Sequence, residues 1–353
     1  MEFVFDNYNT KIFFSREIKK IENIDTGNTI VIADENTFPI AKRIFGEQNI
    51  IFCRLKSGEE NKNWQSVETI IKTAENAGLG RDGLFIGVGG GLIGDLAGFA
   101  ASIYMRGCKL ILVSTTLLAM ADASIGGKTG FNISGIKNLV GSFYPAREVI
   151  MPLECLASLA QREWKSGFAE LIKTSILCGD DFMEMLADFA PNDFSNPAVL
   201  LEGEKLFNCI KKAAVFKGEI VSEDMHDFGK RAILNLGHTF GHALEAASGF
   251  NITHGEAVAW GIYQSCLLGS SLGITPRRRA EKIKSLLESF GYDCSSPHPL
   301  AASPSFKNAF IHDKKKKQNM TFIIPDEKSA RAVTVKGEEM KLAEKILYKG
   351  PKK

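Results

Sequence analysis

Histidines gather in one short part of the sequence, at a spacing that suits a metal ion. Three of the six histidines, His238, His242 and His254, fall within one stretch, and the first two stand four residues apart. Residues four apart share one face of a helix. Two imidazoles with one carboxylate form the ligand set of a catalytic zinc site that keeps a position open. Helical histidines are more often ordinary core or surface residues, so both interpretations stand at this point.

Three further features add to the candidate chemistry of this half. Glu170 and Lys173 lie one helical turn apart in FAELIKTSIL, among apolar neighbours, which suits a partly buried site; a surface ion pair is the alternative. Asn235 precedes His238 by about one helical turn, and Arg231 precedes it by about two. The glycines in LNLGHTFGHALE weaken a helix by about 1 kcal/mol each relative to alanine, which makes sense if something approaches the backbone closely.

A glycine-rich loop between an expected strand and an expected helix predicts an anion site in the first half. The apolar run Leu84–Val88 leads into GGGLIGD and then the small-residue helix Leu96–Ile103. Glycines admit a phosphate close to the backbone, and the helix N-terminus offers N–H groups. The spacing of Gly89, Gly91 and Gly94 fits the dinucleotide fingerprint, but the acidic residue expected about 20 residues later is missing. Glycines that only pack a helix on a sheet are the alternative.

Two more strand ends carry polar residues. Leu110–Val113 is followed by two threonines and then by Asp122, and Thr29–Ala33 is followed by Asp34. Ligands of open α/β sheets bind at the carboxyl ends of strands. Asp34 suits a ribose ligand and a helix cap equally well. A nicotinamide site in one half and a histidine metal site in the other together suggest metal-assisted alcohol oxidation.

The elements that must position these groups change type near residue 160. Before it, short apolar strands alternate with helices, which predicts a parallel sheet covered by helices. After it, apolar residues recur at helical spacing, with one late hairpin formed by Met320–Ile324 and Ala330–Val335. We therefore expect an α/β Rossmann-like domain over residues 1–160, followed by an all-α metal- and substrate-binding domain over residues 161–353.

Composition limits the function classes. The 353 residues carry a net charge of +2 and are 44% hydrophobic, which gives no reason to expect nucleic acid or a membrane surface as a partner. No signal peptide and no membrane span are expected. The seven cysteines are scattered without a CxxC pair, which is typical of reduced thiols in a cytosolic protein.

Several motifs together resemble the 3-dehydroquinate synthase family of the shikimate pathway. They are GGGLIGDLAGF, YMRG, STTLLAMADASIGGKTGFN with KN at 137–138, FAELIK, LNLGHTFGHALE and HGEAVAWG, and the similarity spans about residues 30–325. The resemblance implies NAD, a divalent zinc or cobalt ion, and a sugar acid phosphate substrate held between the two domains. It also implies transient oxidation by NAD, phosphate elimination, reduction and intramolecular aldol closure, which yields 3-dehydroquinate.

The resemblance also assigns residues, position by position. Its metal ligands fall on Glu170, His238 and His254, which makes His242 a substrate-site residue instead. Its substrate contacts fall on Asp122, Lys128, Asn138, Lys173, Lys217, Arg231, Asn235 and His242. Its NAD contacts fall on Asp34, Asn36, Glu59, Lys62, Gly91, Leu92, Ile93, Gly94, Asp95, Thr115, Thr116, Asp122, Lys128, Lys137, Cys155 and Ser158. Arg106 matches the arginine that the family lends to a neighbouring subunit, which implies a homodimer, and Lys314 or Lys315 matches a late lysine.

The chain departs from the usual family pattern in two places. Ile133–Ile136 replaces a His-Pro-Leu-Gly segment, and Asp227 and Lys230 stand where a glutamate and an apolar residue are usual. Three alternatives remain: a sibling sugar phosphate cyclase, a metal-dependent polyol dehydrogenase of the glycerol dehydrogenase type, and a non-catalytic nucleotide-binding protein. The set of Lys217, Arg231, Asn235 and His242 favours the dehydroquinate-forming enzyme, because it suits a substrate carboxylate.

Overall fold

The computed structural model describes residues 1–349 except 47, 190–193, 195, 250 and 316–319, and the side chains of 311–315, 348 and 349 are also outside the description. By internal contacts the chain forms two compact units. The first comprises Met1–Leu159 and Leu201–His226, and the second comprises Ala160–Leu200 and Asp227–Lys353. The sequence predicts one boundary near residue 160. The chain changes unit there, but it returns to the first unit for Leu201–His226, which we expected in the helical half.

The first unit contains a seven-stranded sheet, as the fold prediction required. Its order is β1-β2-β9-β6-β5-β3-β4. Neighbouring strands run parallel, except that β1 is antiparallel to β2. The strands are β1 (Glu2–Phe5), β2 (Tyr8–Ser15), β3 (Thr29–Asp34), β4 (Ile51–Leu55), β5 (Leu84–Gly89), β6 (Lys109–Ser114) and β9 (Glu148–Pro152).

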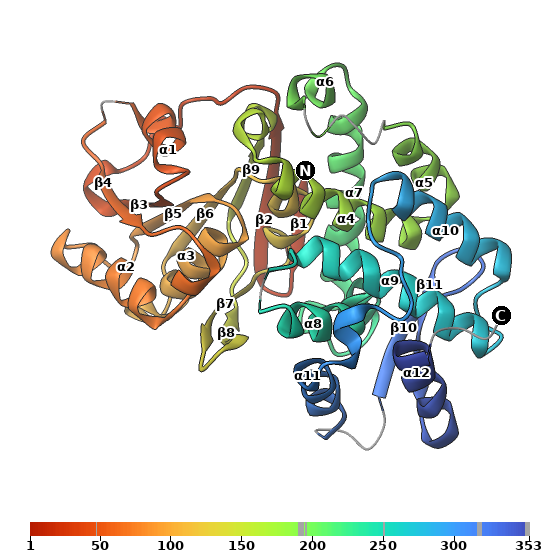
Figure 1. Cartoon of the computed structure of the whole chain (residues 1–353). Helices are drawn as coiled ribbons and strands as arrows, with labels where there is room; N and C mark the ends of the chain where they lie inside the picture. Colours follow the sequence, from red (N-terminus) through yellow and green to blue (C-terminus); the bar gives the residue numbers. More distant parts are fainter. Residues whose placement is uncertain (47, 190–193, 195, 250, 316–319, 350–353) are drawn as a thin grey trace. The chain divides into compact units, whose positions relative to one another are not determined.

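Three helices connect the central strands and cover both faces of the sheet. They are α1 (Phe38–Phe45), α2 (Trp64–Asn76) and α3 (Gly91–Ile103). The chain passes from β3 to β4 in one direction along the sheet, and from β4 back through β5 to β6 in the other. Right-handed crossovers then place α1 on one face and α2 and α3 on the other, as Figure 1 shows. The strand order reverses at β3 and β5, which is where such sheets bind ligands.

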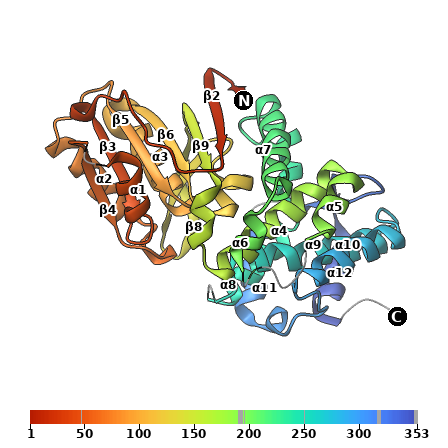
Figure 2. The same ribbon diagram turned by 90° about the horizontal axis from the view of Figure 1, so that it is seen from above.

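A hairpin and a distant helix complete the first unit. The hairpin pairs β7 (Lys128–Ile133) with β8 (Ile136–Phe143). The helix is α7 (Lys205–Glu223), which Figure 2 shows beside the N-terminal strands. A Cβ on Gly218 of α7 would lie 2.5 Å from the ring of Phe3 in β1. Glycine therefore lets α7 pack directly against β1, which explains why this helix belongs to the first unit.

The second unit is helical, as predicted, with one small hairpin. Its helices are α4 (Gln161–Cys178), α5 (Asp180–Ala187), α6 (Pro197–Leu201, whose last residue lies in the first unit), α8 (His238–Ala247), α9 (His254–Ser271), α10 (Arg277–Ser289), α11 (Pro304–Lys315) and α12 (Gly337–Lys349). The hairpin pairs β10 (Met320–Pro325) with β11 (Ala330–Val335). Helices α11 and α12 stand on either side of this hairpin in the sequence, and α11 extends to Lys315.

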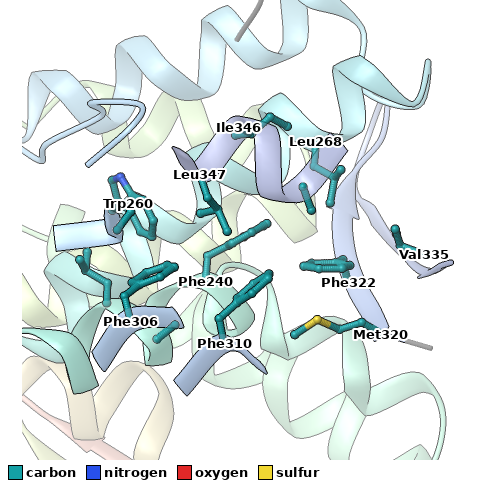
Figure 3. Packing of buried hydrophobic residues seen from close by; sticks show 14 of the residues in the cluster. Phe240, Trp260, Leu268, Phe306, Phe310, Met320, Phe322, Val335, Ile346 and Leu347 are labelled. Atoms are coloured by element: carbon teal, nitrogen blue, oxygen red, sulfur yellow. The ribbon is translucent and has the colours of Figure 1, made fainter. Parts of the chain in front are cut away.

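An aromatic core fixes α8 and α9 within this unit. Phe240 of α8 packs against Phe322 of β10, with ring centres 5.2 Å apart, and stacks on Phe310 of α11 at 5.8 Å. Trp260 of α9 meets the ring of Phe306 edge to face. Figure 3 shows these rings together with the aliphatic side chains around them. Because Phe240 anchors one side of α8, the histidines on either side of it in sequence have a fixed orientation.

The Glu154 carboxylate, in the segment after β9, bonds to the loop that follows β2 and to α1. Glu154 accepts a hydrogen bond from the backbone N–H of Ile18 at 2.9 Å and pairs with Arg43 at 2.5 Å. The Ile18 hydrogen bond, helped by Arg43, lowers the pKa of Glu154. A carboxylate with a lowered folded-state pKa stabilises the fold above its unfolded pKa of about 4.3, and that contribution is lost as pH falls through the folded pKa.

We therefore expect Glu154→Gln to lower the free energy of unfolding by about 1 kcal/mol at neutral pH. The deficit should shrink as the pH falls below the unfolded pKa. Urea unfolding at neutral and acidic pH measures both values. Glu68→Gln is the control, because Glu68 makes an exposed pair with Lys72 on one helix. An equal deficit at both pH values would contradict this account.

None of the helices among the described residues is long and apolar enough to cross a membrane.

Candidate functional site

The glycine loop of the first unit has the predicted strand–loop–helix geometry. β5 ends at Gly89 and α3 begins at Gly91. A Cβ on Gly89 would lie 2.5 Å from Ile93, and one on Gly90 would lie 2.8 Å from Thr116. A Cβ on Gly91 would meet only Ala123, at an ordinary 3.5 Å. The first two glycines therefore serve packing, and the first turn of α3 offers its N–H groups to an anion.

Asp34 at the end of β3 acts as a turn-stabilising residue. Its Oδ1 atom accepts hydrogen bonds from the backbone N–H groups of Asn36 and Thr37, both at 2.9 Å, and from the Thr37 hydroxyl at 3.0 Å. These bonds hold the carboxylate in one orientation just before α1. The helix-cap interpretation is wrong, because Thr37 is the N-cap residue of α1 and no side chain caps it; the ribose role stays a prediction.

A buried hydroxyl marks the carboxyl end of β6. Thr115 Oγ1 is buried and, within the described part of the chain, makes no hydrogen bond. A buried hydroxyl without a partner is unfavourable unless a ligand satisfies it. The next residue, Thr116, uses its hydroxyl to accept the N–H of Ala119. The unsatisfied Thr115 hydroxyl, on the strand next to the glycine loop, fits a cofactor-binding site.

A buried lysine connects Asp95, which is assigned to NAD, with Asn138, which is assigned to the substrate. Lys62 Nζ donates to Asp95 Oδ2 at 2.5 Å and to Asn138 Oδ1 at 2.6 Å. Burial raises the pKa of Asp95, although the Lys62 cation opposes that effect. Lys137 Nζ lies 3.8 Å from Glu59 Oε1. Because Lys62 is only 5% exposed, its main contact is with α3 and the hairpin.

Lys217 of α7 reaches the segment after β6. Its Nζ atom lies 2.9 Å from Asp122 Oδ1 and donates to Asp122 O at 2.8 Å. These two contacts hold the ammonium group in one place.

Two further predicted residues of the first unit have exposed side chains. Lys128 is exposed at the start of β7, and Arg106 is exposed with a left-handed backbone (φ 69°).

The segment that follows β9 presents backbone rather than reactive side chains. The Cys155 thiol is buried, and burial raises its pKa to about 12. The Ser158 hydroxyl donates to the Cys155 carbonyl at 3.3 Å. If this segment meets a cofactor, as the resemblance implies, the Cys155 side chain contributes packing only.

In the second unit, Glu170 and Lys173 form a buried pair. Glu170 is fully buried, Lys173 is 1% exposed, and Lys173 Nζ lies 2.5 Å from Glu170 Oε2. The surface ion pair considered above is therefore wrong. Burying two charges costs more than an exposed pair returns, so a role beyond stability is the reasonable explanation.

Three histidine rings lie close to one another, and two of them belong to a cluster with Glu170. The ring centres of His238 and His254 lie 5.3 Å apart, and His242 lies 5.2 Å from His238. His254 Nε2 is 3.3 Å from Glu170 Oε1. One ligand atom from each of Glu170, His238 and His254 lies within 4.8 Å of the other two. The donor set and spacing fit a divalent ion, and they bring together the three predicted ligands.

The charges around the histidines differ. Burial, with the nearby Lys173 ammonium, holds the pKa of His238 well below its usual value, so this imidazole is neutral. Burial alone would also lower the pKa of His254, but the carboxylates of Glu170 and Glu245 raise it to about 9. A neutral His238 has a lone pair for an ion. His254 lies between two carboxylates, which favour its protonated form.

Backbone contact between α8 and α9 sets the separation of the histidines. A Cβ on Gly261 would lie 2.0 Å from Gly237 O, and one on Gly241 would lie 2.9 Å from Ala257 O. A Cβ on Gly255 would lie 2.4 Å from Ser166 O of α4. The prediction that something approaches Gly237 and Gly241 closely is confirmed, and the approaching group is the backbone of α9 at Val258 and Ala257.

Of the remaining predicted residues of this unit, Arg231 and Asn235 lie on the segment before α8, and His242 lies within α8. Arg231 is 2% exposed, whereas Asn235 is partly exposed and His242 is exposed. The side chains of Lys314 and Lys315 fall outside those that the structure describes. Sequence reasoning missed Glu245, a 4% exposed carboxylate 3.8 Å from His254 Nδ1. The signal was its position seven residues after His238, which places it on the same face of α8.

Two family models match consecutive parts of the chain. The model described as 3-dehydroquinate synthase N-terminal matches residues 52–166, and the one described as 3-dehydroquinate synthase C-terminal matches residues 167–316. Together they cover most of the chain.

Curated relatives and solved structures agree with these matches. A 3-dehydroquinate synthase of Methylacidiphilum infernorum is 43% identical over 66% of this chain and 63% of its own length, less than two thirds. One of Dictyoglomus turgidum is 40% identical over 75% of this chain and 74% of its own. A crystal structure of 2-deoxy-scyllo-inosose synthase, complexed with carbaglucose-6-phosphate, NAD+ and Co2+, superimposes with a TM-score of 0.81 at 28% identity, over 98% of each chain.

Proposed function

Since the chain belongs to the 3-dehydroquinate synthase family, we propose that it converts 3-deoxy-D-arabino-heptulosonate 7-phosphate into 3-dehydroquinate and phosphate. It is then a carbon–oxygen lyase of the shikimate pathway and of aromatic amino acid biosynthesis. The observation that carries the proposal is the cluster of Glu170, His238 and His254 beside the buried Lys173. A carboxylate and two imidazoles without a metal role would leave costly polar groups gathered in a largely buried place.

The proposed cofactors are NAD and a zinc or cobalt ion. The first turn of α3 and the unsatisfied Thr115 hydroxyl support the NAD site. Glu170, His238 and His254 would hold the ion. When bound, NAD accepts and returns a hydride at one carbon, and the ion acidifies the hydroxyl on that carbon.

The chain's own residues would bind and orient an anionic substrate. The substrate carries a carboxylate and a phosphate, which suit lysine and arginine. Lys173 is fixed by Glu170, and Lys217 is fixed by Asp122, so both ammonium groups are oriented in advance. Such preorganisation lowers the entropy lost when the substrate is bound and helps to hold one conformer. The other proposed substrate contacts are Lys128, Asn138, Arg231, Asn235 and His242.

The proposal includes assembly and location. Arg106 is exposed on a strained backbone, which suits a residue offered to a second copy in a homodimer. Every one of the seven cysteines is a free thiol, which supports a cytoplasmic enzyme.

The decisive test is phosphate release from the heptulosonate phosphate, in the presence of NAD and zinc. Absorbance of NADH is followed in parallel, and a chelator serves as the metal-removal control. We expect stoichiometric phosphate, no accumulation of NADH and loss of turnover with the chelator. Steady accumulation of NADH with a simple polyol would instead identify a polyol dehydrogenase.

A sibling cyclase is the second candidate, because the similar 2-deoxy-scyllo-inosose synthase structure covers 98% of the chain. Glucose 6-phosphate and sedoheptulose 7-phosphate are therefore assayed beside the heptulosonate phosphate. Phosphate release from either of them, without release from the heptulosonate phosphate, would favour that candidate.

A further inference from the structure

The second ring nitrogen of each proposed histidine ligand faces an acceptor. His238 Nδ1 lies 3.2 Å from the carbonyl oxygen of Leu236. His254 Nδ1 lies 3.8 Å from Glu245 Oε2, while its Nε2 faces Glu170 at 3.3 Å. Each ring therefore directs one nitrogen to an acceptor and leaves the other for the ligand cluster.

Glu245 is a buried carboxylate that the proposed reaction does not use. It lies two turns after His238 on α8 and is only 4% exposed. A carboxylate in such a place is costly unless it meets a cation or a hydrogen-bond donor. The imidazole of His254, at the start of α9, is such a partner.

We infer that Glu245 is a positioning residue. It accepts a hydrogen bond from the Nδ1–H group of His254 and so directs the Nε2 lone pair to the divalent ion. This inference rests on the proposed metal site. A neutral imidazole has one N–H and one lone pair, so fixing the proton on Nδ1 fixes the lone pair on Nε2. The present 3.8 Å separation is an ion-pair contact, and a small rotation of either side chain would bring it into hydrogen-bond range.

A carboxylate behind a histidine ligand also makes that ligand a stronger donor. Loss of such a partner typically weakens metal binding about 10- to 100-fold. Because α8 supplies both His238 and Glu245, one helix would provide a ligand and also orient the ligand that comes from α9.

The test uses the full-length protein, stripped of metal and titrated with Co2+. Competition with a chelator gives the affinity, and the visible absorption of the bound cobalt reports its ligand geometry. We expect Glu245→Ala to bind Co2+ about 10- to 100-fold more weakly, with altered absorption bands. Glu245→Gln should lose less Co2+ affinity, since its amide oxygen can still accept a hydrogen bond from the Nδ1–H group of His254.

Glu256→Gln is the matched control. Glu256 stands two residues after His254 and caps α9 through Thr253, with Glu256 Oε2 accepting from the Thr253 N–H at 3.0 Å. It shares the helix start but, in the described contacts, it pairs with Lys165 and not with the imidazole. Its Co2+ affinity and spectrum should match those of the unmodified protein.

Two results would overturn the inference. One is an unchanged Co2+ affinity and spectrum in the Glu245 variants; if the alanine variant fails to fold, the glutamine variant decides. The other is an equal loss in Glu256→Gln, which would mean that any disturbance of the α9 start weakens the site. In either of these two cases the proposed metal site itself would still stand, because His238→Ala would abolish Co2+ binding. If the unmodified protein has no Co2+ site sensitive to His238→Ala, the proposed metal site fails together with this inference.

Discussion

Replacing His238 with alanine is expected to remove bound metal and turnover together. His238 is one of three side chains whose ligand atoms lie within 4.8 Å of one another. Its loss leaves two ligands, too few to hold a catalytic ion firmly. A metal ion supplies several kcal/mol of transition-state stabilisation, so we expect phosphate release to fall by about 10³-fold or more.

Metal content after gel filtration and the rate of phosphate release measure the two effects. Lys128→Ala is the comparison, because Lys128 lies on β7 of the first unit and takes no part in the ligand cluster. It should lose activity while keeping its metal. Full turnover with retained metal in His238→Ala would refute the ligand assignment.

Replacing Gly261 with alanine is expected to cause the largest loss of stability. The new Cβ would lie 2.0 Å from Gly237 O and 2.9 Å from Gly241 N. Both are backbone atoms of the α8 segment, which cannot rotate away as a side chain would. Relief requires α8 and α9 to separate, at a cost of about 3 kcal/mol or more. Because these helices carry His238 and His254, metal affinity should fall as well.

Urea unfolding of the metal-free protein measures the loss of stability, and Co2+ titration measures the loss of metal affinity. Ser271→Ala is the control, since Ser271 is exposed at the far end of α9. An unchanged unfolding midpoint in Gly261→Ala would show that α8 and α9 are not held in backbone contact.

Elements with a strong local pattern could be predicted from the sequence. A strand, glycines and a helix follow one another from Leu84 to Ile103 in the predicted order, because buried apolar runs and glycines determine that structure locally, but α3 begins at Gly91 and not at Leu96. The hairpin of β7 and β8 was missed. Its strands are partly exposed and carry polar residues and one glycine each, so they lack an apolar alternation. Its turn at Ser134 and Gly135, both with positive φ, was the one local signal.

The candidate metal site shows what spacing cannot supply. The four-residue spacing suggested His238 and His242, whereas the structure groups His238 with His254 and Glu170. Glu170 comes from α4, far from α8 in sequence, so only tertiary packing brings them together. The family resemblance named the three residues because it carries that tertiary information. The burial of Glu170 and Lys173 was equally beyond a local pattern.

The place of α7 in the first unit has a consequence for synthesis on the ribosome. The first unit needs Leu201–His226, and the ribosome makes Ala160–Leu200, which belongs to the second unit, before it. The contacts of Phe3 with Gly218 and of Asp122 with Lys217 can therefore form only late in translation. A nascent chain that ends near residue 160 would expose the β1 surface that α7 covers. Cotranslational folding of the first unit thus stays incomplete until part of the second has emerged.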